Sequence, residues 1–150
     1  MNELLTVKDL HVSIKSPQGK VEAVRGVNLE LRPGEVLAIV GESGCGKSML
    51  CKSIMKLLPK NASIERGAIV ANGVDITSYK ERDMAKLRGR LFSMVFQDPM
   101  TSLDPTMTVG AQIAEAVLLH DPKMSKEEAY RRVIQLMELV GIPRPQERYK

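Results

Sequence analysis

The stretch Gly41-Glu42-Ser43-Gly44-Cys45-Gly46-Lys47-Ser48 determines how the rest of this 150-residue sequence is interpreted. It matches the pattern G-x-x-x-x-G-K-[ST] at every fixed position. Glycines allow the backbone to turn tightly, and successive N–H groups of such a turn point into one concavity. That concavity lies at the start of a helix, where the helix dipole favours anions. The stretch therefore predicts a phosphate-binding loop between a strand and a helix.

Two side chains of the loop have the chemistry to act on a bound phosphate chain. Lys47 can reach the β- and γ-phosphates of a nucleotide, and the hydroxyl group of Ser48 can coordinate Mg²⁺. The residues that we expect to contact the ligand are Gly41, Glu42, Ser43, Gly44, Cys45, Gly46, Lys47, Ser48 and Met49.

The residues on both sides of the loop predict the strand and the helix that the motif requires. Residues 36–40 are apolar without alternation, which is typical of a central strand buried on both faces of a parallel sheet. After the loop, apolar residues recur at helical spacing, so a helix is predicted over residues 47–58 and ends before Pro59. These apolar residues are Leu50, Ile54, Leu57 and Leu58.

Strands are predicted through most of the first part of the chain. Apolar and polar residues alternate over residues 10–14 and 27–31, and a turn lies between them at residues 16–19. A short strand is expected over residues 67–71, followed by the turn pair Asn72-Gly73. Residues 91–96 predict a second apolar, buried strand.

The patterns become helical after residue 98. Val109, Ile113 and Val117 mark one helix, and a capping box at residues 125–128 opens another. The apolar stripe of that second helix is Ala129, Val133, Leu136, Met137 and Val140. We expect Gly141 and Pro143 to end it, and a capping box at residues 78–81 to open a short helix earlier in the chain.

Composition and charge exclude several classes of protein. Two cysteines cannot form a disulfide scaffold, and no apolar run approaches the ~20 residues of a membrane span. The N-terminus lacks the basic and apolar regions of a signal peptide, so a cytosolic protein is expected. The basic excess over residues 80–90 is interrupted by acidic residues and indicates a solvated helix face, so no nucleic-acid partner is predicted.

A second motif, residues 96–105, follows the second apolar strand and allows two interpretations. In the first, Asp98 is the carboxylate that holds Mg²⁺, and the chain is a small, complete P-loop kinase or GTPase. That carboxylate normally ends the apolar run directly, whereas here Gln97 intervenes and Pro99 follows.

The second interpretation is a resemblance. V-G-E-S-G-C-G-K-S together with V-F-Q-D-P-M-T-S-L-D-P resembles the ATP-binding subunits of ABC transporters, specifically the oligopeptide/dipeptide/nickel importer subfamily. The resemblance covers essentially the whole chain and implies an α/β fold, the P-loop NTPase fold of an ABC-type nucleotide-binding domain. Residues 1–97 would be the β-rich N-terminal part and the start of the RecA-like core, with residues 41–48 as the Walker A loop. Residues 98–150 would hold the Q-loop region and the start of the helical subdomain.

The resemblance also implies site residues, cofactors and partners. Lys47 and Gln97 would be the catalytic residues, with Gln97 as the Q-loop glutamine that contacts Mg²⁺ and the attacking water. Ser48 and Gln97 would be the metal-contacting residues, and ATP and Mg²⁺ the cofactors. The intact subunit would energise a bacterial importer of peptides or nickel from the cytoplasmic face of the cell membrane. Its partners would be a second nucleotide-binding subunit, the transmembrane permease subunits and, indirectly, an extracytoplasmic substrate-binding protein.

The sequence departs from the family pattern in two ways. The signature motif, the Walker B strand with its catalytic glutamate and the switch histidine are absent from these 150 residues, so we expect nucleotide binding without efficient turnover. No aromatic residue lies between Leu10 and Leu31 to stack on adenine, which leaves Ile14, Pro17 or Val21 as apolar contacts. A third interpretation is a non-catalytic fragment that binds a partner through helices in residues 106–140.

Overall fold

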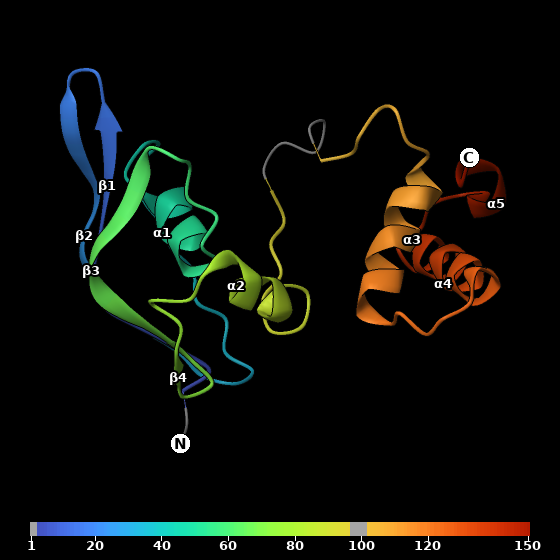
Figure 1. Cartoon of the computed structure of the whole chain (residues 1–150), viewed down its shortest axis with the longest axis horizontal. Coiled ribbons are helices and arrows are strands. Elements are labelled where there is room, and N and C mark those ends of the chain that lie inside the picture. Colours follow the sequence, from blue (N-terminus) through green and yellow to red (C-terminus); the bar gives the residue numbers. More distant parts are fainter. Residues whose placement is uncertain (1–2, 97–101) are drawn as a thin grey trace. The chain divides into compact units, whose positions relative to one another are not determined.

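The structure is a computed structural model that describes residues 3–96 and 102–150. The chain divides into two compact units, Met1–Ser93 and Met94–Lys150 (Figure 1). Gln97 and Asp98, the two residues that separate the competing interpretations of the second motif, lie outside the described residues. The division of the chain into residues 1–97 and 98–150 stays a prediction.

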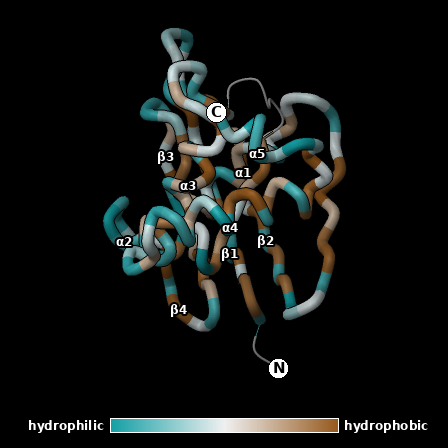
Figure 2. Tube along the Cα trace, turned by 90° about the vertical axis from the view of Figure 1, so that its right-hand side faces the viewer, coloured by the Kyte–Doolittle hydropathy of each residue, from teal (hydrophilic) through white to brown (hydrophobic). Residues whose placement is uncertain are grey.

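The first unit contains an antiparallel four-stranded sheet with the strand order β2-β1-β3-β4. Its strands are β1 (Leu5–Ser16), β2 (Gly19–Leu31), β3 (Ala62–Ala71) and β4 (Val74–Asp75). The first two strands and the turn between them confirm the alternating pattern of the sequence, and the hydropathy of β1 and β2 alternates along the chain (Figure 2). The predicted short strand is the second half of β3.

Helices α1 (Lys47–Ile54) and α2 (Glu81–Leu87) belong to the same unit, and α1 packs against β1 and β2. The buried cluster between sheet and helices consists of Val7, Leu10, Val12, Val24, Leu50, Ile54, Ile69, Ala71, Ile76 and Met84. Each fully buried aliphatic side chain of this kind contributes about 1.5–3 kcal/mol relative to an exposed one. The cluster fixes the start of α1, and with it the end of the phosphate loop, on the sheet.

Helix α1 ends four residues earlier than the sequence pattern predicts. Lys56 has a positive φ of 54°, its N–H donates to the Ser53 carbonyl, and the Leu57 N–H donates to the Lys52 carbonyl at 2.7 Å. These two bonds form a Schellman motif, which satisfies the last carbonyls of the helix and reverses the chain. The apolar spacing continues to Leu58, which still packs against the core, but the backbone has left the helix.

The two predicted buried strands are wrong for this structure. Residues 36–40 have no regular secondary structure, and Val36 and Val40 are 94% and 91% exposed. Residues 91–96 form only an isolated bridge between Arg88 and Phe92. A strand buried on both faces needs hydrogen-bonded neighbours and an apolar cover. The described residues supply no neighbouring strand to either segment, although Leu91 and Phe92 pack against the buried cluster.

The second unit is helical, as predicted. Its helices are α3 (Val109–His120), α4 (Lys126–Leu139) and α5 (Pro145–Arg148). The capping box at the start of α4 is confirmed, because the Ser125 hydroxyl accepts from the Glu128 N–H and the Glu128 carboxylate accepts from the Ser125 N–H. Gly141, with φ of 77°, ends the helix with a Schellman motif.

Two local predictions for the helices are wrong. The short helix α2 begins at Glu81 with Lys80 as its N-cap and no side-chain cap, because the Glu81 carboxylate binds the Arg88 guanidinium instead of the Ser78 backbone. In the stripe of α4, Val140 is 72% exposed because it lies past the last turn of the helix. Of the other residues of the stripe, Ala129, Val133 and Met137 are buried as expected and Leu136 is half-buried.

Polar side chains link the strands on one face of the sheet. The Glu65 carboxylate accepts hydrogen bonds from the Ser13 hydroxyl (2.5 Å) and the Ser63 hydroxyl (2.8 Å), and lies 2.9 Å from the Lys20 ammonium group. These interactions lower the pKa of Glu65 to about 2, and the hydrogen bond from Ser13 contributes most to the shift. At a neighbouring position, hydrogen bonds from Arg66 and then His11 hold the pKa of Asp9 below its ordinary value.

The lowered pKa of Glu65 predicts a pH-dependent contribution to stability. Because the folded-state pKa lies below the unfolded value of 4.5, the ionised carboxylate stabilises the fold above about pH 4.5, and this stabilisation is lost as the pH falls towards 2. Unfolding free energies of the wild type and Glu65→Gln, measured from neutral to acid pH, should differ by a constant amount above about pH 5 and converge below it. A difference that does not change with pH would contradict this account; Glu30→Gln, at an exposed position on β2, is the control.

Candidate functional site

The phosphate loop lies between the unpaired residues 36–40 and helix α1, and its backbone depends on two glycines. Gly44 has φ of 82° and Gly46 has φ of 99°, in the region that side chains with a Cβ rarely adopt. Gly46 is the N-cap of α1, and its carbonyl accepts the first helical hydrogen bond, from the Leu50 N–H at 2.9 Å. The loop therefore turns directly into the helix, as the motif requires.

A close main-chain contact places the loop against the sheet. A Cβ atom on Gly46 would lie 2.2 Å from the carbonyl oxygen of Ala23 on β2, so no side chain fits between them. The strand register shifts at this point, because Val24 pairs with Val12 while Glu22 pairs with the next residue, Ser13. Ala23 is thus the extra residue of a β-bulge, which brings its carbonyl towards the loop.

The Lys47 side chain folds back over the loop. Its ammonium group donates to the carbonyl oxygens of Gly41 (2.7 Å) and Glu42 (2.6 Å) and lies 3.5 Å from the sulfur of Cys45. The cysteine sulfur also occupies the space beside Gly41, where a Cβ would lie 2.8 Å from it. One cation therefore holds the two ends of the loop together.

The start of α1 is open to an anion. The helix has no side-chain cap and no acidic residue in its first turn, so no protein side chain compensates the positive end of its dipole. Residues 41–45 and Ser48 are exposed, whereas Lys47 and Met49 are half-buried. Within the described ranges, the Ser48 hydroxyl makes no hydrogen bond to protein. Exposed backbone amides and a lysine are the donors that bind phosphate oxygens, and a free hydroxyl is a ligand for Mg²⁺.

Other predicted site residues are placed only in part. Ile14 and Val21 lie directly opposite each other on β1 and β2, whereas Pro17 lies in the turn that joins these strands. Gln97, the predicted partner of Mg²⁺, lies outside the described residues. No group of three or more His, Cys, Asp or Glu side chains in the described part of the chain has the geometry of a metal site.

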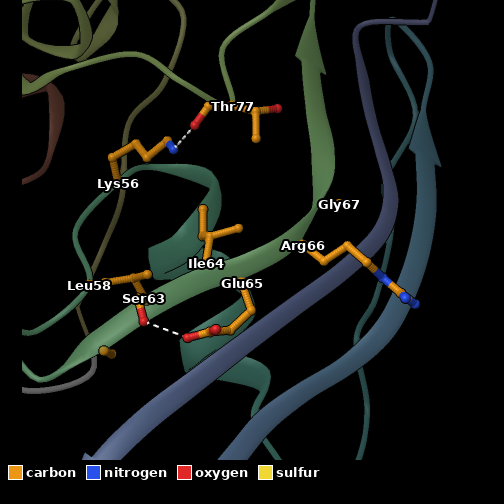
Figure 3. Close-up of a pocket in the computed structure, with 9 residues that line it drawn as sticks. Lys56, Leu58, Ser63, Ile64, Glu65, Arg66, Gly67 and Thr77 are labelled. Carbon is orange, nitrogen blue, oxygen red and sulfur yellow. Dashed lines mark hydrogen bonds between the residues drawn. The ribbon is translucent and has the colours of Figure 1, made fainter.

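A shallow groove of about 380 Å³ lies elsewhere in the first unit, between the end of α1, β3 and the segment at Thr77 (Figure 3). The Lys56 ammonium group faces it and donates a short hydrogen bond to the Thr77 carbonyl. Burial lowers the pKa of Lys56, and the nearby charge of Asp75 partly opposes that shift. The Arg66 side chain extends away from the groove, where it binds Asp9. Because the Glu65 carboxylate also lines this groove, the groove is a weaker candidate for an anion than the phosphate loop.

The contact between Gly46 and Ala23 is the part of the site that the sequence does not reveal. The motif requires a glycine before the lysine, but nothing in the sequence of β2 marks Ala23 as the residue that it meets. A bulge is set by the relative lengths of two paired strands, and an alternating pattern of apolar residues does not encode that length difference.

Known proteins with a similar sequence identify the family of this chain. The family model described as "ABC transporter" matches residues 24–149, and the chain therefore belongs to the ABC transporter family. The chain is 51% identical over 149 residues to the oligopeptide transport ATP-binding protein OppD of Bacillus subtilis. It is 50% identical over 151 residues to the dipeptide transport ATP-binding protein DppD of the same organism, and 46% identical over 147 residues to OppD of Escherichia coli.

The chain spans only part of these relatives. It covers 41% of the length of Bacillus subtilis OppD, 45% of Bacillus subtilis DppD and 43% of Escherichia coli OppD, while 99%, 100% and 98% of the chain itself is matched. The match therefore extends over essentially all of this sequence and less than half of each relative.

Solved structures show the same fold. The ATP-binding cassette MJ0796, in a dimeric post-hydrolysis state bound to ADP and Pi, matches 90% of this chain with a TM-score of 0.75 at 22% identity, over 56% of its own length. CbiO1 from Clostridium perfringens matches 95% of the chain with a TM-score of 0.67 and 26% identity, over 52% of its length. The α/β fold of a P-loop NTPase, predicted from the loop and the second motif, is thus confirmed. Among the described helices, none is long and apolar enough to cross a bilayer.

The contact with Ala23 predicts different effects of two otherwise similar substitutions. Gly44→Ala and Gly46→Ala both place a Cβ at a positive φ, but only residue 46 also meets a backbone oxygen, since nothing lies within 4 Å of a Cβ at residue 44. The strain of the left-handed backbone alone costs about 1–2 kcal/mol. Gly46→Ala should lower the free energy of unfolding by clearly more than Gly44→Ala, as measured by chemical denaturation. Equal losses would show that Ala23 does not constrain the loop.

Proposed function

We propose that this chain is the N-terminal part of the ATP-binding subunit of a bacterial ABC importer for peptides, and that its phosphate loop binds Mg-ATP. The observation that supports this most strongly is the open start of α1, where a glycine loop, Lys47 and Ser48 converge. The names of the relatives add the transport of oligopeptides or dipeptides. Nickel, the other substrate of the predicted subfamily, is not named by these relatives.

The geometry fits a nucleoside triphosphate with its magnesium ion. The backbone N–H groups at the start of α1 would bind phosphate oxygens, and the space around the Cβ position of Gly44 is open, so a ligand can approach the backbone closely there. The Ser48 hydroxyl, and Gln97 from the second motif, would coordinate Mg²⁺, which supplies charge neutralisation of the phosphates. For Lys47 to reach the β- and γ-phosphates, its ammonium group must exchange the carbonyl oxygens of Gly41 and Glu42 for phosphate oxygens.

The role in transport follows from family membership. In the intact subunit, ATP binding would close two such subunits on each other, and hydrolysis would reopen them, while the permease subunits convert this motion into transport. The second nucleotide-binding subunit, the permease subunits and an extracytoplasmic binding protein are therefore the proposed partners, and the inner face of the cell membrane is the proposed location. These 150 residues alone should bind nucleotide and hydrolyse it slowly or not at all, because the motifs for a general base and for the signature contact are absent from them.

The proposal predicts that Mg-ATP binding depends on one lysine of helix α1. Hydrogen bonds to charged groups contribute about 1.5–3 kcal/mol, so Lys47→Ala should weaken binding by roughly 10- to 150-fold. Lys52→Ala, at a half-buried position on the same helix, is the control and should bind as the wild type does. Isothermal titration calorimetry measures both, and equal affinities of Lys47→Ala and the wild type would contradict the proposal.

The rate of ATP hydrolysis distinguishes the proposed function from that of a complete small kinase or GTPase. If the 150 residues hydrolysed ATP rapidly and Lys47→Ala abolished that activity, the chain would be a complete enzyme. Asp98→Ala would then remove metal-dependent binding, whereas under the present proposal Asp98 is not the Walker B carboxylate.

We further propose that an aliphatic pair replaces the aromatic platform under the adenine base. Ile14 and Val21 are a cross-strand pair, so their side chains project from the same face of the sheet. Ile14 shares that face with Val12, which is buried in the cluster that includes Leu50 of α1. The pair therefore lies on the side of the sheet that carries the phosphate loop, and Val21, at 54% exposure, is available for contact.

An aromatic side chain in this pair should strengthen nucleotide binding selectively. Stacking of a base on an aromatic ring is worth about 1–3 kcal/mol, so Ile14→Tyr should bind ATP roughly 5- to 150-fold more tightly than the wild type. Tripolyphosphate, which has no base, should bind both proteins equally. Val74→Tyr, an exposed position on β4, is the control. Equal gains for ATP and tripolyphosphate would show that Ile14 does not contact the base.

A further inference from the structure

The Arg88 side chain closes the far end of α1. Arg88 is the C-cap of α2, and its guanidinium group donates to the carbonyl oxygen of Met55 from both Nε and Nη2, at 3.1 Å each. Nη2 also donates to the carbonyl oxygen of Lys56 at 3.3 Å, and the Arg88 side chain is only 20% exposed. The Schellman motif at this end satisfies the carbonyls of Lys52 and Ser53, so Arg88 binds the two carbonyls at which the chain leaves the helix.

The same guanidinium group also binds the start of α2. The Glu81 carboxylate, at the first residue of that helix, accepts from Nη1 at 2.5 Å and from Nη2 at 3.0 Å. These hydrogen bonds from Arg88 hold the pKa of Glu81 below its ordinary value. Because the guanidinium fork presents five N–H groups in one plane, it can bind the carboxylate and the two carbonyls at once. Arg88 therefore joins the end of α1 to α2 within the first unit (Figure 1).

The position of this cation matters for the phosphate loop at the other end of the helix. The carbonyl oxygens at the end of a helix carry the negative end of its dipole, and a cation bound there compensates that charge. With eight residues, α1 is only about 12 Å long, so the positive end that phosphates would use is close by. Hydrogen bonds in series polarise one another, so a charge-assisted bond to the last carbonyls strengthens the bonds before it.

A helix as short as α1 depends on the groups that bind its two ends. Isolated helices shorter than about 12–15 residues are marginal in water. At the start of α1, the close approach of Gly46 and Ala23 fixes the backbone, and at its end Arg88 does so from α2. The Lys52 ammonium group, in the last turn of α1, makes no hydrogen bond to protein within the described ranges, so Lys52 offers a matched comparison.

We propose that Arg88 is a positioning residue of the phosphate site. By binding the carbonyls of Met55 and Lys56, it orders the last turn of α1 and increases the affinity of the helix start for phosphate oxygens. The proposal rests on the proposed binding of Mg-ATP, and adds to it a residue at the opposite end of the helix from the phosphates. Because coupling between two sites is reciprocal, a phosphate bound at the start of α1 should in turn strengthen the hydrogen bonds of Arg88.

Affinities for Mg-ATP, measured well below the unfolding temperature by isothermal titration calorimetry, test this role. A charge at a helix end is worth roughly 2- to 5-fold in an equilibrium constant, so Arg88→Gln should weaken binding by about that factor. Arg88→Lys keeps a charged donor and should recover part of the loss. Lys52→Ala removes a charge from the last turn of α1 without removing a bond to a carbonyl, and should bind as the wild type does.

A variant of Glu81 separates positioning of the phosphate site from a purely structural link between the two helices. Glu81→Gln removes the ion pair with α2 but leaves Arg88 on the carbonyls of Met55 and Lys56. The Glu81 side chain is 74% exposed, so the fold should tolerate this change. Glu81→Gln should therefore keep the affinity of the wild type for Mg-ATP, whereas a purely structural link would make it lose affinity as Arg88→Gln does.

The Nε–H proton of Arg88 gives a readout that needs no change to the arginine. It donates to the Met55 carbonyl, and its exchange with solvent is followed by NMR. A concentration of Mg-ATP that saturates the wild type should slow this exchange, because the hydrogen bond becomes stronger. At the same concentration, Lys47→Ala should show no slowing, because it leaves the site largely empty.

Equal affinity of Arg88→Gln and the wild type for Mg-ATP would overturn the proposal. An equal loss of affinity in Glu81→Gln and Arg88→Gln would also overturn it, because the arginine would then be a structural link only. If Arg88→Gln does not fold, the exchange of the Arg88 Nε–H proton decides, and an unchanged rate in the saturated wild type counts against the proposal. If the wild type itself shows no saturable binding, the proposed function fails, and this role of Arg88 fails with it.

Discussion

The carbonyl oxygen of Ala23 leaves no room for a side chain at residue 46, and this constraint fixes the phosphate loop on the sheet. The β-bulge in β2 moves that carbonyl towards the loop, the buried cluster holds α1 against β1 and β2, and Gly46 joins the two. A residue with a Cβ at this position would have to displace main-chain atoms rather than a flexible side chain. The direction of α1, and therefore the direction of its exposed amides, follows from this contact.

The charges around the loop complete the site. The helix start carries no acidic cap, so its positive end is left for a ligand, and the Lys47 ammonium group binds two carbonyl oxygens of the loop itself. Both features favour an anion as the ligand, because backbone amides and an ammonium group bind phosphate oxygens more strongly than they bind neutral carbonyls. The loop thus combines a rigid base, at Gly46, with a cation that is free to change partners.

The sequence predicts those parts of this structure that depend on residues close together in the chain. The turn of residues 41–46 into helix α1, the hairpin of β1 and β2, and the capping box at Ser125 are set by neighbouring residues, and the structure confirms them. The early end of α1 arises from a left-handed Lys56 that no helical periodicity indicates. The two apolar runs at residues 36–40 and 91–96 have the composition of buried strands, but a buried strand requires neighbouring strands distant in the sequence, which the described residues do not supply. The candidate site was predictable in its residue types, whereas its attachment to β2 was not.

The central claim is that phosphates bind at the start of α1, and amide chemical shifts measure this most directly. Titration of Mg-ATP into the isotope-labelled chain should shift the backbone amide signals of Gly44, Gly46 and Ser48 in a saturable manner, and leave those of Ile64 and Thr77, in the separate groove, unchanged. Saturable shifts confined to the groove, or no saturable shift at the loop, would contradict the account.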